Sequence, residues 1–231
     1  MLRLRTRRYE RVATAQLGLS VVELMVGIAV GLFVVAAAAM LVSTQLSDNR
    51  RLLLETQVQQ DLRAAADIIT RELRRAGHWN RAEQFVWIGA GVPVDNPHGP
   101  LEFDAPDQVR FDYNPPSGSG PYGFRRQGSV LQTRLGSGGW QELTDGNTLR
   151  ITSLSVTPQD RVTPAVPVPC PNLCPDGSSD CWPTRTLTVR ELVVDIQGEA
   201  VADPAVKRSL RSVVRLRNDL VSADPSASCP A

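Results

Sequence analysis

Residues 24–42 read LMVGIAVGLFVVAAAAMLV, 19 consecutive residues without a charged or strongly polar side chain. As an α-helix this stretch would be roughly 28 Å long, close to the thickness of the hydrocarbon core of a bilayer. We therefore expect residues 19–42 to form a transmembrane helix. Residues 1–18 carry five arginines against one glutamate, a formal charge of +4, and arginines are scarce just after the span. This asymmetry predicts that residues 1–18 stay in the cytoplasm and that the rest of the chain lies outside.

A helical pattern continues beyond the apolar run. Seven apolar residues recur at spacings of 4, 4, 3, 4, 4 and 3, the pattern of a helix with one apolar stripe. They are Leu54, Val58, Leu62, Ala65, Ile69, Leu73 and Ala76, and charged side chains occupy the opposite face. We expect one helix over residues 19–76, about 87 Å long, that stops at Gly77 and is amphipathic over residues 43–76. An apolar half followed by an amphipathic half is typical of a membrane anchor that carries a docked head.

One acidic residue, Glu23, lies at the start of the apolar run. An ionised carboxylate inside a membrane costs about 3 kcal/mol even on lenient scales, so such a group normally has a partner. No lysine, arginine or histidine lies between Gly18 and Asp48, so we expect the partner of Glu23 to come from outside this helix. Gly27 and Gly31 form a GxxxG spacing that would let another helix approach closely, although glycines are also ordinary residues of membrane helices.

The segment GLSVVEL at residues 18–24 resembles the prepilin peptidase site of type IV pilins and type II secretion pseudopilins. In that family the leader is cut after the glycine and the new N-terminal residue is N-methylated. The glutamate at the fifth mature position faces the α-amine of a neighbouring subunit. For this chain the resemblance implies cleavage after Gly18, a methylated N-terminus at Leu19 and an assembly contact at Glu23. It also supplies the cationic partner that Glu23 lacks on its own helix.

Two positions depart from the commonest pattern of that family. Leu19 stands where phenylalanine is usual, and Met40 stands where major pilins often carry a helix-kinking proline, which favours a minor subunit. One alternative is an ordinary secretory signal that is cut near Ala39, and another is a plain single-pass anchor without a role in assembly. The secretory signal would leave Glu23 unexplained and would separate two stretches that share one helical pattern.

The remainder of the chain, residues 77–231, has the pattern of a β-rich head. All 17 prolines lie at Pro93 or later, so this part must be broken into strands and loops. Apolar runs between turn residues predict strands at 84–88, 108–113, 122–126, 130–135, 140–143, 148–157, 185–197 and 209–217, with a loop at 114–121. One break in the alternation within 148–157 predicts a β-bulge. We expect an α+β fold in which the long helix packs on an antiparallel sheet, as in type IV pilins.

Residues 158–183 form the most unusual segment, a proline-rich stretch with three of the four cysteines. A loop of this length needs to be pinned or to have a function. Disulfides among Cys170, Cys174, Cys181 and Cys229 would pin it in an oxidising compartment, and of the three possible pairings we favour Cys170–Cys174 with Cys181–Cys229. Zinc is the rival interpretation, but the sequence contains no Cys-x-x-Cys pair and both histidines lie far upstream.

Catalytic motifs are absent from the sequence, which predicts that the protein is not an enzyme. There is no Gly-x-Ser-x-Gly, phosphate-binding loop or HExxH. His78 follows the long helix, where a cation favours the helix C-terminus, and His98 lies in a turn. Residues 176–180 have too few oxygen ligands to predict a calcium site, and the scattered arginines of the head lack the interleaved aromatic residues of a nucleic-acid groove.

The order of the parts of the head, with the run SVVRLRN at 212–218, resembles PilW-type minor pilins. The resemblance implies a subunit without a cofactor that primes or caps pilus assembly with other minor and major pilins, in support of twitching motility, adhesion or DNA uptake. It implies residence in the bacterial inner membrane with the head in the periplasm, and later in the pilus. The J-type minor pseudopilin of type II secretion shares this architecture and is the first alternative. A membrane-anchored periplasmic binding or enzymatic domain is the second.

Overall fold

The computed structural model describes residues 18–82, 96–114, 120–223 and 229–230. The chain divides into two compact units, residues 1–50 and residues 51–231. The helix α1 (Val21–Leu73) contributes to both units. Together with the antiparallel sheets of the second unit, this long helix confirms the predicted α+β class.

The first unit contains the N-terminal half of α1. Every side chain from residue 18 to residue 50 is exposed, the apolar run at 24–42 included. Within the described part of the chain, α1 is the helix that is long and apolar enough to cross a membrane, by length and composition. A run of exposed apolar side chains on all faces is unfavourable in water and favourable in lipid. This half of α1 is therefore a candidate membrane anchor.

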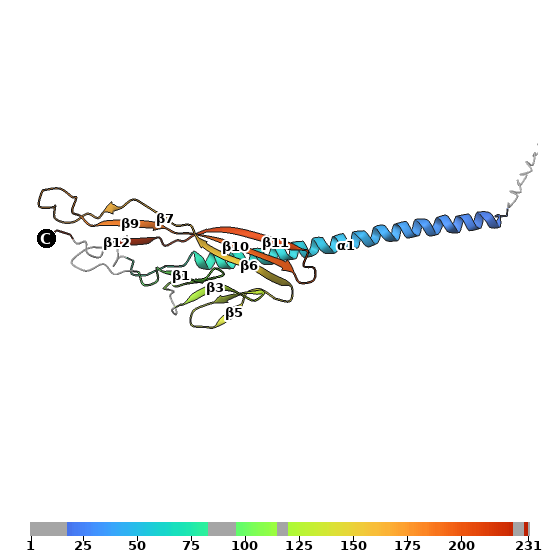
Figure 1. Ribbon diagram of the computed structural model, residues 1–231, viewed down its shortest axis with the longest axis horizontal. Helices are drawn as coiled ribbons and strands as arrows, with labels where there is room; N and C mark the ends of the chain where they lie inside the picture. Colours follow the sequence, from blue (N-terminus) through green and yellow to red (C-terminus); the bar gives the residue numbers. More distant parts are fainter. Residues whose placement is uncertain (1–17, 83–95, 115–119, 224–228, 231) are drawn as a thin grey trace, which may run out of the picture. The chain divides into compact units, whose positions relative to one another are not determined.

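The described residues of the second unit form three antiparallel sheets (Figure 1). Sheet A is a meander in the order β1 (Leu101–Ala105), β2 (Gln108–Phe111), β3 (Tyr122–Gln127), β4 (Val130–Arg134) and β5 (Trp140–Glu142). Sheet B has the order β11 (Lys207–Arg215), β10 (Glu191–Ala200) and β6 (Leu149–Pro158). Sheet C has the order β12 (Leu220–Ala223), β9 (Thr184–Val189) and β7 (Arg161–Val162), with β8 (Val166–Pro167) also paired to β9.

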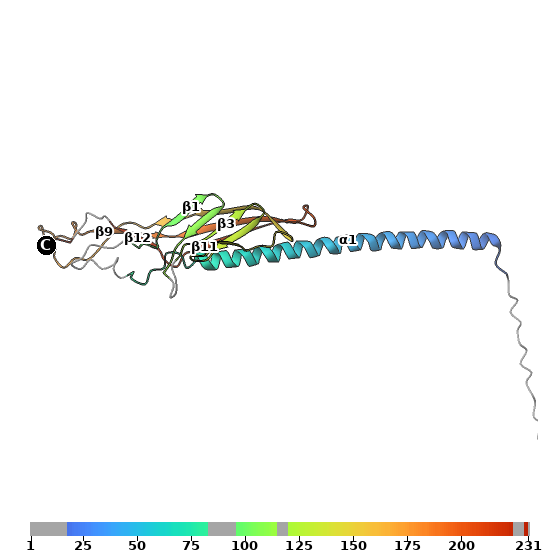
Figure 2. The same ribbon diagram turned by 90° about the horizontal axis from the view of Figure 1, so that it is seen from below.

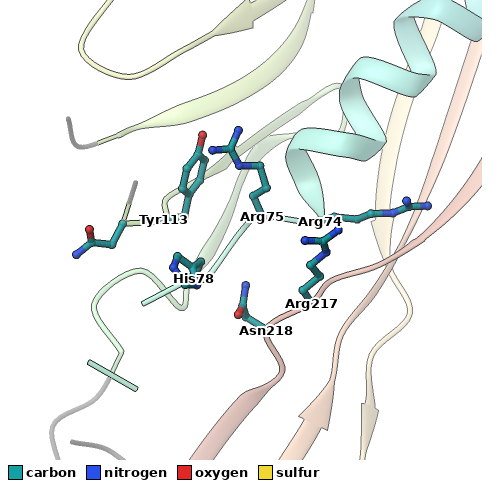
Figure 3. A pocket seen from close by; sticks show the side chains of 7 residues that line it. Arg74, Arg75, His78, Tyr113, Arg217 and Asn218 are labelled. Carbon is teal, nitrogen blue, oxygen red and sulfur yellow. The ribbon is translucent and has the colours of Figure 1, made fainter. Parts of the chain in front are cut away.

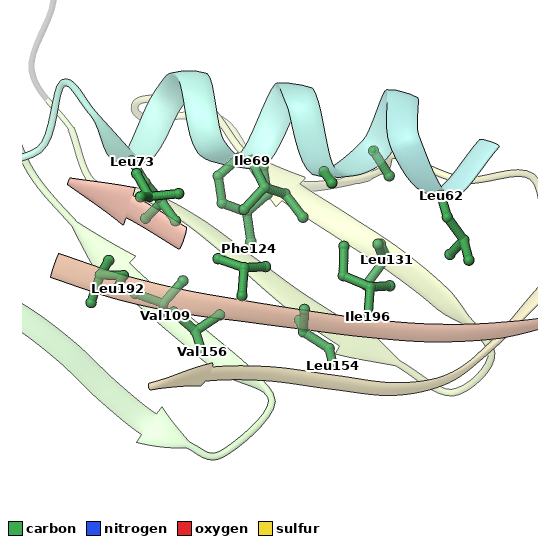
Figure 4. Packing of buried hydrophobic residues seen from close by; sticks show 14 of the residues in the cluster. Leu62, Ile69, Leu73, Val109, Phe124, Leu131, Leu154, Val156, Leu192 and Ile196 are labelled. Atoms are coloured by element: carbon green, nitrogen blue, oxygen red, sulfur yellow. The ribbon is translucent and has the colours of Figure 1, made fainter. Parts of the chain in front are cut away.

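The second half of α1 runs alongside sheet B (Figure 2) and buries its apolar stripe there. Six of the seven stripe residues are buried, from Val58 to Ala76, and Leu54 is partly buried against the same core. The predicted amphipathic helix is thus confirmed. Figure 4 shows Leu62, Ile69 and Leu73 pointing from α1 toward side chains of sheets A and B such as Phe124 and Ile196. Burial of each large apolar side chain stabilises the fold by about 1.5–3 kcal/mol, so this cluster is what joins the helix to the sheets.

The predicted bulge in β6 is confirmed. Opposite β10, Ser153 pairs with Gln197 and Ile151 pairs with Gly198, so one residue of β6 is left without a partner in the ladder. The shift lets Leu149, Ile151, Leu154 and Val156 all face the core, although their spacing is not a strict alternation. A Cβ atom at Gly198 would lie 2.9 Å from the Leu149 side chain and 3.2 Å from the Arg150 carbonyl, so a larger residue there would displace Leu149 at the bulge.

One predicted strand, at 185–197, is wrong. The chain leaves sheet C after β9, passes through Arg190 and enters sheet B as β10. Arg190 is 4% exposed, its backbone N–H donates to Asp219 Oδ1 (3.4 Å) and its carbonyl accepts from the Leu216 N–H (3.0 Å). These partners lie more than twenty residues further along the chain, so no local pattern marks the change of sheet.

Other predicted strands correspond to β2, β3, β4, β5, β6 and β11 with small changes of bounds. The sequence did not predict β1 and β12, nor the short β7 and β8 within the segment at 158–183. The strand predicted at 84–88 and most of the loop at 114–121 lie outside the described residues.

The cysteine pairing that we favoured is also wrong. The structure joins Cys174 to Cys181 and Cys170 to Cys229, with Cα–Cα distances of 5.8 and 5.5 Å. A turn explains the local pair, because Gly177 has a φ of 81°, donates to the Cys174 carbonyl (2.8 Å) and folds the chain back. The Cys181 N–H consequently lies 3.0 Å from Cys174 Sγ. Cys170 is left to pair with Cys229 near the C-terminus.

The C-terminal end of α1 is tied to three separate segments of the head. The helix ends at Leu73, three residues before the predicted end at Ala76, and a turn over residues 74–77 leads into Gly77, which has a φ of 74°. Four hydrogen bonds hold this end: Gly77 N–H to Asp112 O (2.9 Å), Arg217 N–H to Arg74 O (3.2 Å), Asn96 Nδ2 to Gly77 O (2.8 Å) and Asn218 Nδ2 to Ala76 O (3.1 Å). The carbonyls of the turn that follows the helix therefore have partners from the head.

Candidate assembly site at the start of helix α1

The first turn of α1 carries a capping box formed by Ser20 and Glu23. The Ser20 Oγ accepts a hydrogen bond from the Val22 N–H (3.2 Å), and Glu23 Oε2 accepts one from the Ser20 N–H (3.1 Å). A serine followed three residues later by glutamate is the usual signature of such a cap. Our sequence reasoning missed this cap because it searched for a cation. The carboxylate of Glu23 thus has a hydrogen-bond partner at the start of its own helix, the Ser20 N–H. This partner is neutral, so the negative charge of Glu23 is still not balanced by a cation.

Gly18 and Leu19 precede the helix and are both exposed. A Cβ atom at Gly18 would meet no described atom within 4 Å. The described residues therefore give no steric reason for glycine at position 18. A requirement for glycine there must come from something that binds this segment from outside.

Gly27 and Gly31 lie on the exposed N-terminal half of α1. A Cβ atom at either position would also meet nothing within 4 Å among the described residues. Neither glycine is needed for packing against the described residues. The face that they share is open to a second helix.

The two histidines have different surroundings in the head. His98 Nδ1 lies 2.9 Å from Asp112 Oδ2, and this contact ties the turn of His98 to the end of β2. His78 is exposed in the turn after α1. Within the described ranges no group of three or more His, Cys, Asp or Glu side chains could hold a metal ion, and the four cysteines are oxidised to disulfides. In residues 176–180, Asp176 Oδ1 accepts the Ser178 N–H (2.9 Å) and stabilises a turn.

A long N-terminal helix, apolar in its first half and docked on antiparallel sheets in its second, defines a pilin-like protein. Residues 51–216 match the model of a family described as prepilin peptidase-dependent protein B. The match covers more than half of the chain, and the chain belongs to this family. Pilin-like families are generally structural rather than catalytic. Neither a curated protein nor a solved structure matches the chain.

The extent of the family match matters for the start of α1. The match begins at residue 51, so it does not include Gly18, Leu19 or Glu23. The head and the segment before the apolar run therefore point to pilin-like proteins independently of each other.

Proposed function

We propose that this protein is a PilW-type minor pilin that primes or caps assembly of a type IV pilus. In this proposal prepilin peptidase cuts after Gly18, and Leu19 becomes the N-methylated first residue. Residues 19–42 hold the mature protein in the inner membrane with the head in the periplasm until it joins other minor and major pilins. Twitching motility, adhesion and DNA uptake are the activities that such a pilus would support.

The observation that carries the proposal is the coincidence of two independent signals. The segment at 18–24 has the residues of a prepilin peptidase site directly before a membrane-length apolar run. Residues 51–216 match a family whose description names dependence on the same peptidase. A plain membrane anchor or a secretory signal would not require the two to occur together.

Cleavage would create a second partner for Glu23, close to the one that it has in the capping box. In the uncut chain its carboxylate accepts the Ser20 N–H. A cut after Gly18 would place a positively charged α-amine on Leu19, one residue before that N–H. The carboxylate of Glu23 would then lie near the Leu19 α-amine of its own subunit. It could also pair with the α-amine of a neighbouring subunit. In lipid, pairing with either α-amine is strongly favoured over an isolated charge.

Mass spectrometry of the membrane-extracted protein tests the first step. We expect an N-terminus at Leu19 with one added methyl group, and a cut near Ala39 or an uncut chain would contradict the proposal. Deletion of the gene tests the second step, because loss of surface pili supports a minor pilin. Loss of enzyme secretion with normal pili would assign the protein to a type II secretion system instead.

A further inference from the structure

Three arginines gather around a small pocket at the C-terminal end of α1. Arg74 and Arg75 come from the turn that follows the helix, and Arg217 follows β11 (Figure 3). The pocket has a volume of about 280 Å³, and His78, Tyr113, Asn114 and Asn218 complete its lining. We call this set of residues the arginine pocket. All of it lies within the unit formed by residues 51–231.

The backbone fixes the positions of these arginines. The Arg217 N–H donates to the Arg74 carbonyl (3.2 Å), the His78 N–H to the Arg75 carbonyl (3.2 Å) and the Asn114 N–H to the His78 carbonyl (2.8 Å). Three segments that are far apart in the sequence are thereby held together. The backbone around the pocket is thus held by tertiary hydrogen bonds between Arg217 and Arg74 and between Asn114 and His78.

The positive charge of the arginine pocket is only partly balanced. Arg75 pairs with Glu72 (3.3 Å) and lies over the Tyr113 ring (4.6 Å to its centroid). Arg74 and Arg217 have no ion pair within the described ranges. Capping of the helix does not use them either, because the nearby carbonyls accept from Asn96, Asn218 and backbone N–H groups. Two guanidinium groups are thus left to bind an anion.

The shape and lining favour a carboxylate over a nucleic acid. The Tyr113 ring, 4% exposed, is covered by Tyr122 (4.1 Å between ring centroids) on one side and by Arg75 on another, so no base could stack on it. The volume suits one side chain rather than a strand. Guanidinium groups match the two oxygens of a carboxylate, which a partner protein supplies on aspartate or glutamate.

We propose that the arginine pocket receives an aspartate or glutamate side chain of another pilin-like subunit. This inference rests on the proposed function for the identity of the partner. The carboxylate specificity of the pocket does not depend on it. The two parts are therefore tested by separate experiments.

The first experiment measures the chemistry of the pocket in the full chain in detergent micelles. Glutarate is the carboxylate probe, and inorganic phosphate and a 12-nucleotide single strand are tested in parallel. Binding is followed by the arginine Nε–H signals in NMR. We expect glutarate to shift the Arg74 and Arg217 signals in a saturable way. Arg74→Gln or Arg217→Gln should each weaken its binding about tenfold, the size of one lost charge-assisted hydrogen bond. Arg211→Gln is the control, because Arg211 is also exposed but lies on β11 outside the pocket, where it pairs with Asp195 (3.9 Å).

Equal glutarate binding by the wild type and the double variant Arg74→Gln/Arg217→Gln would overturn the proposal. If phosphate bound more tightly than glutarate, the carboxylate assignment would be overturned. Binding of the oligonucleotide by the wild type but not by the double variant would overturn it as well.

The second experiment is co-purification from cells, with the melting temperature of each variant as the test of folding. The charge reversal Arg74→Glu/Arg217→Glu should lose the partner subunits that Arg211→Glu retains. If the double reversal recovered those subunits as well as the wild type does, the subunit contact would be refuted. If the wild-type protein were not cut after Gly18, only the proposed function would be refuted.

Discussion

Three substitutions in the first turn of α1 can separate the role of Glu23 as an assembly contact from its role as a cap. Ser20→Ala removes the Oγ that accepts the Val22 N–H and leaves the carboxylate in place. Glu23→Gln keeps an oxygen that can accept the Ser20 N–H but removes the charge. Glu23→Ala removes both the acceptor and the charge. A cap and an assembly contact therefore predict different rank orders.

The two roles also differ in magnitude. Loss of one capping interaction costs about 1 kcal/mol of local helix stability, which only frays the first turn. Removal of one partner from a desolvated charge pair costs roughly 3 kcal/mol or more, because the other charge is left unpaired. A difference of that size lowers the equilibrium for subunit association by more than a hundredfold. We expect Ser20→Ala to assemble nearly as the wild type does and both Glu23 variants to be strongly defective.

The assay is co-purification of each mature variant with its partner subunits, together with a count of surface pili. The N-terminal mass of each variant shows whether cleavage has occurred, so that a failure of processing is not mistaken for a failure of assembly. If Ser20→Ala were as defective as Glu23→Ala while Glu23→Gln assembled normally, Glu23 would act only as a cap. Normal assembly of all three variants would remove Glu23 from the assembly contacts altogether.

Three further predictions concern processing, the disulfides and alkaline pH. Gly18→Val should accumulate uncut precursor on an immunoblot while the head keeps its melting temperature, because a Cβ at position 18 meets no described atom of the chain; normal maturation would contradict the peptidase site. The disulfides Cys170–Cys229 and Cys174–Cys181 close loops with sequence separations of 59 and 7. Loss of the first by paired Cys→Ser changes should therefore cost about 4 kcal/mol of unfolding free energy and loss of the second about 2.5. Equal losses in denaturant titrations would argue against the assigned pairing. Burial raises the pKa of Tyr113 above its ordinary value of 10.0, so the folded head keeps a proton that the unfolded chain releases, and stability should fall as pH rises above that value. Tyr113→Phe should flatten this fall between pH 10 and 11, whereas an unchanged slope would place the titrating group elsewhere.

Local periodicity was enough to predict the parts of the fold that depend on neighbouring residues. The stripe from Val58 to Ala76 follows the turn of a helix, and each of its residues is buried as that pattern requires. The bulge of β6 was visible for the same reason, since the break in alternation lies within ten residues. Gly77 was recognisable because a left-handed residue at the end of a helix is usually glycine.

Features that depend on distant segments could not be predicted in this way. The change of sheet at Arg190 is set by Leu216 and Asp219, and Cys170 pairs with Cys229, which lies 59 residues further along the chain. The arginine pocket joins Arg74 to Arg217 across the whole head, so neither arginine differs in its local sequence from other surface arginines. The cap at Ser20 is a different case, because its serine–glutamate spacing was readable and was overlooked.

The hydrogen bonds at the end of α1 have a mechanical consequence. In the proposed function the subunit is drawn out of a bilayer and pulled along its helix, and the tension would reach the head through residues 51–77. The stripe of buried side chains lies along the helix axis, and the bonds to Asp112, Asn96, Asn218 and Arg217 close its far end. Under such a pull these contacts are sheared together and do not open one after another. Forced unfolding is governed by the rate of unfolding. An interface whose contacts must all break together should therefore survive the pull longer than an equally stable interface whose contacts break one after another.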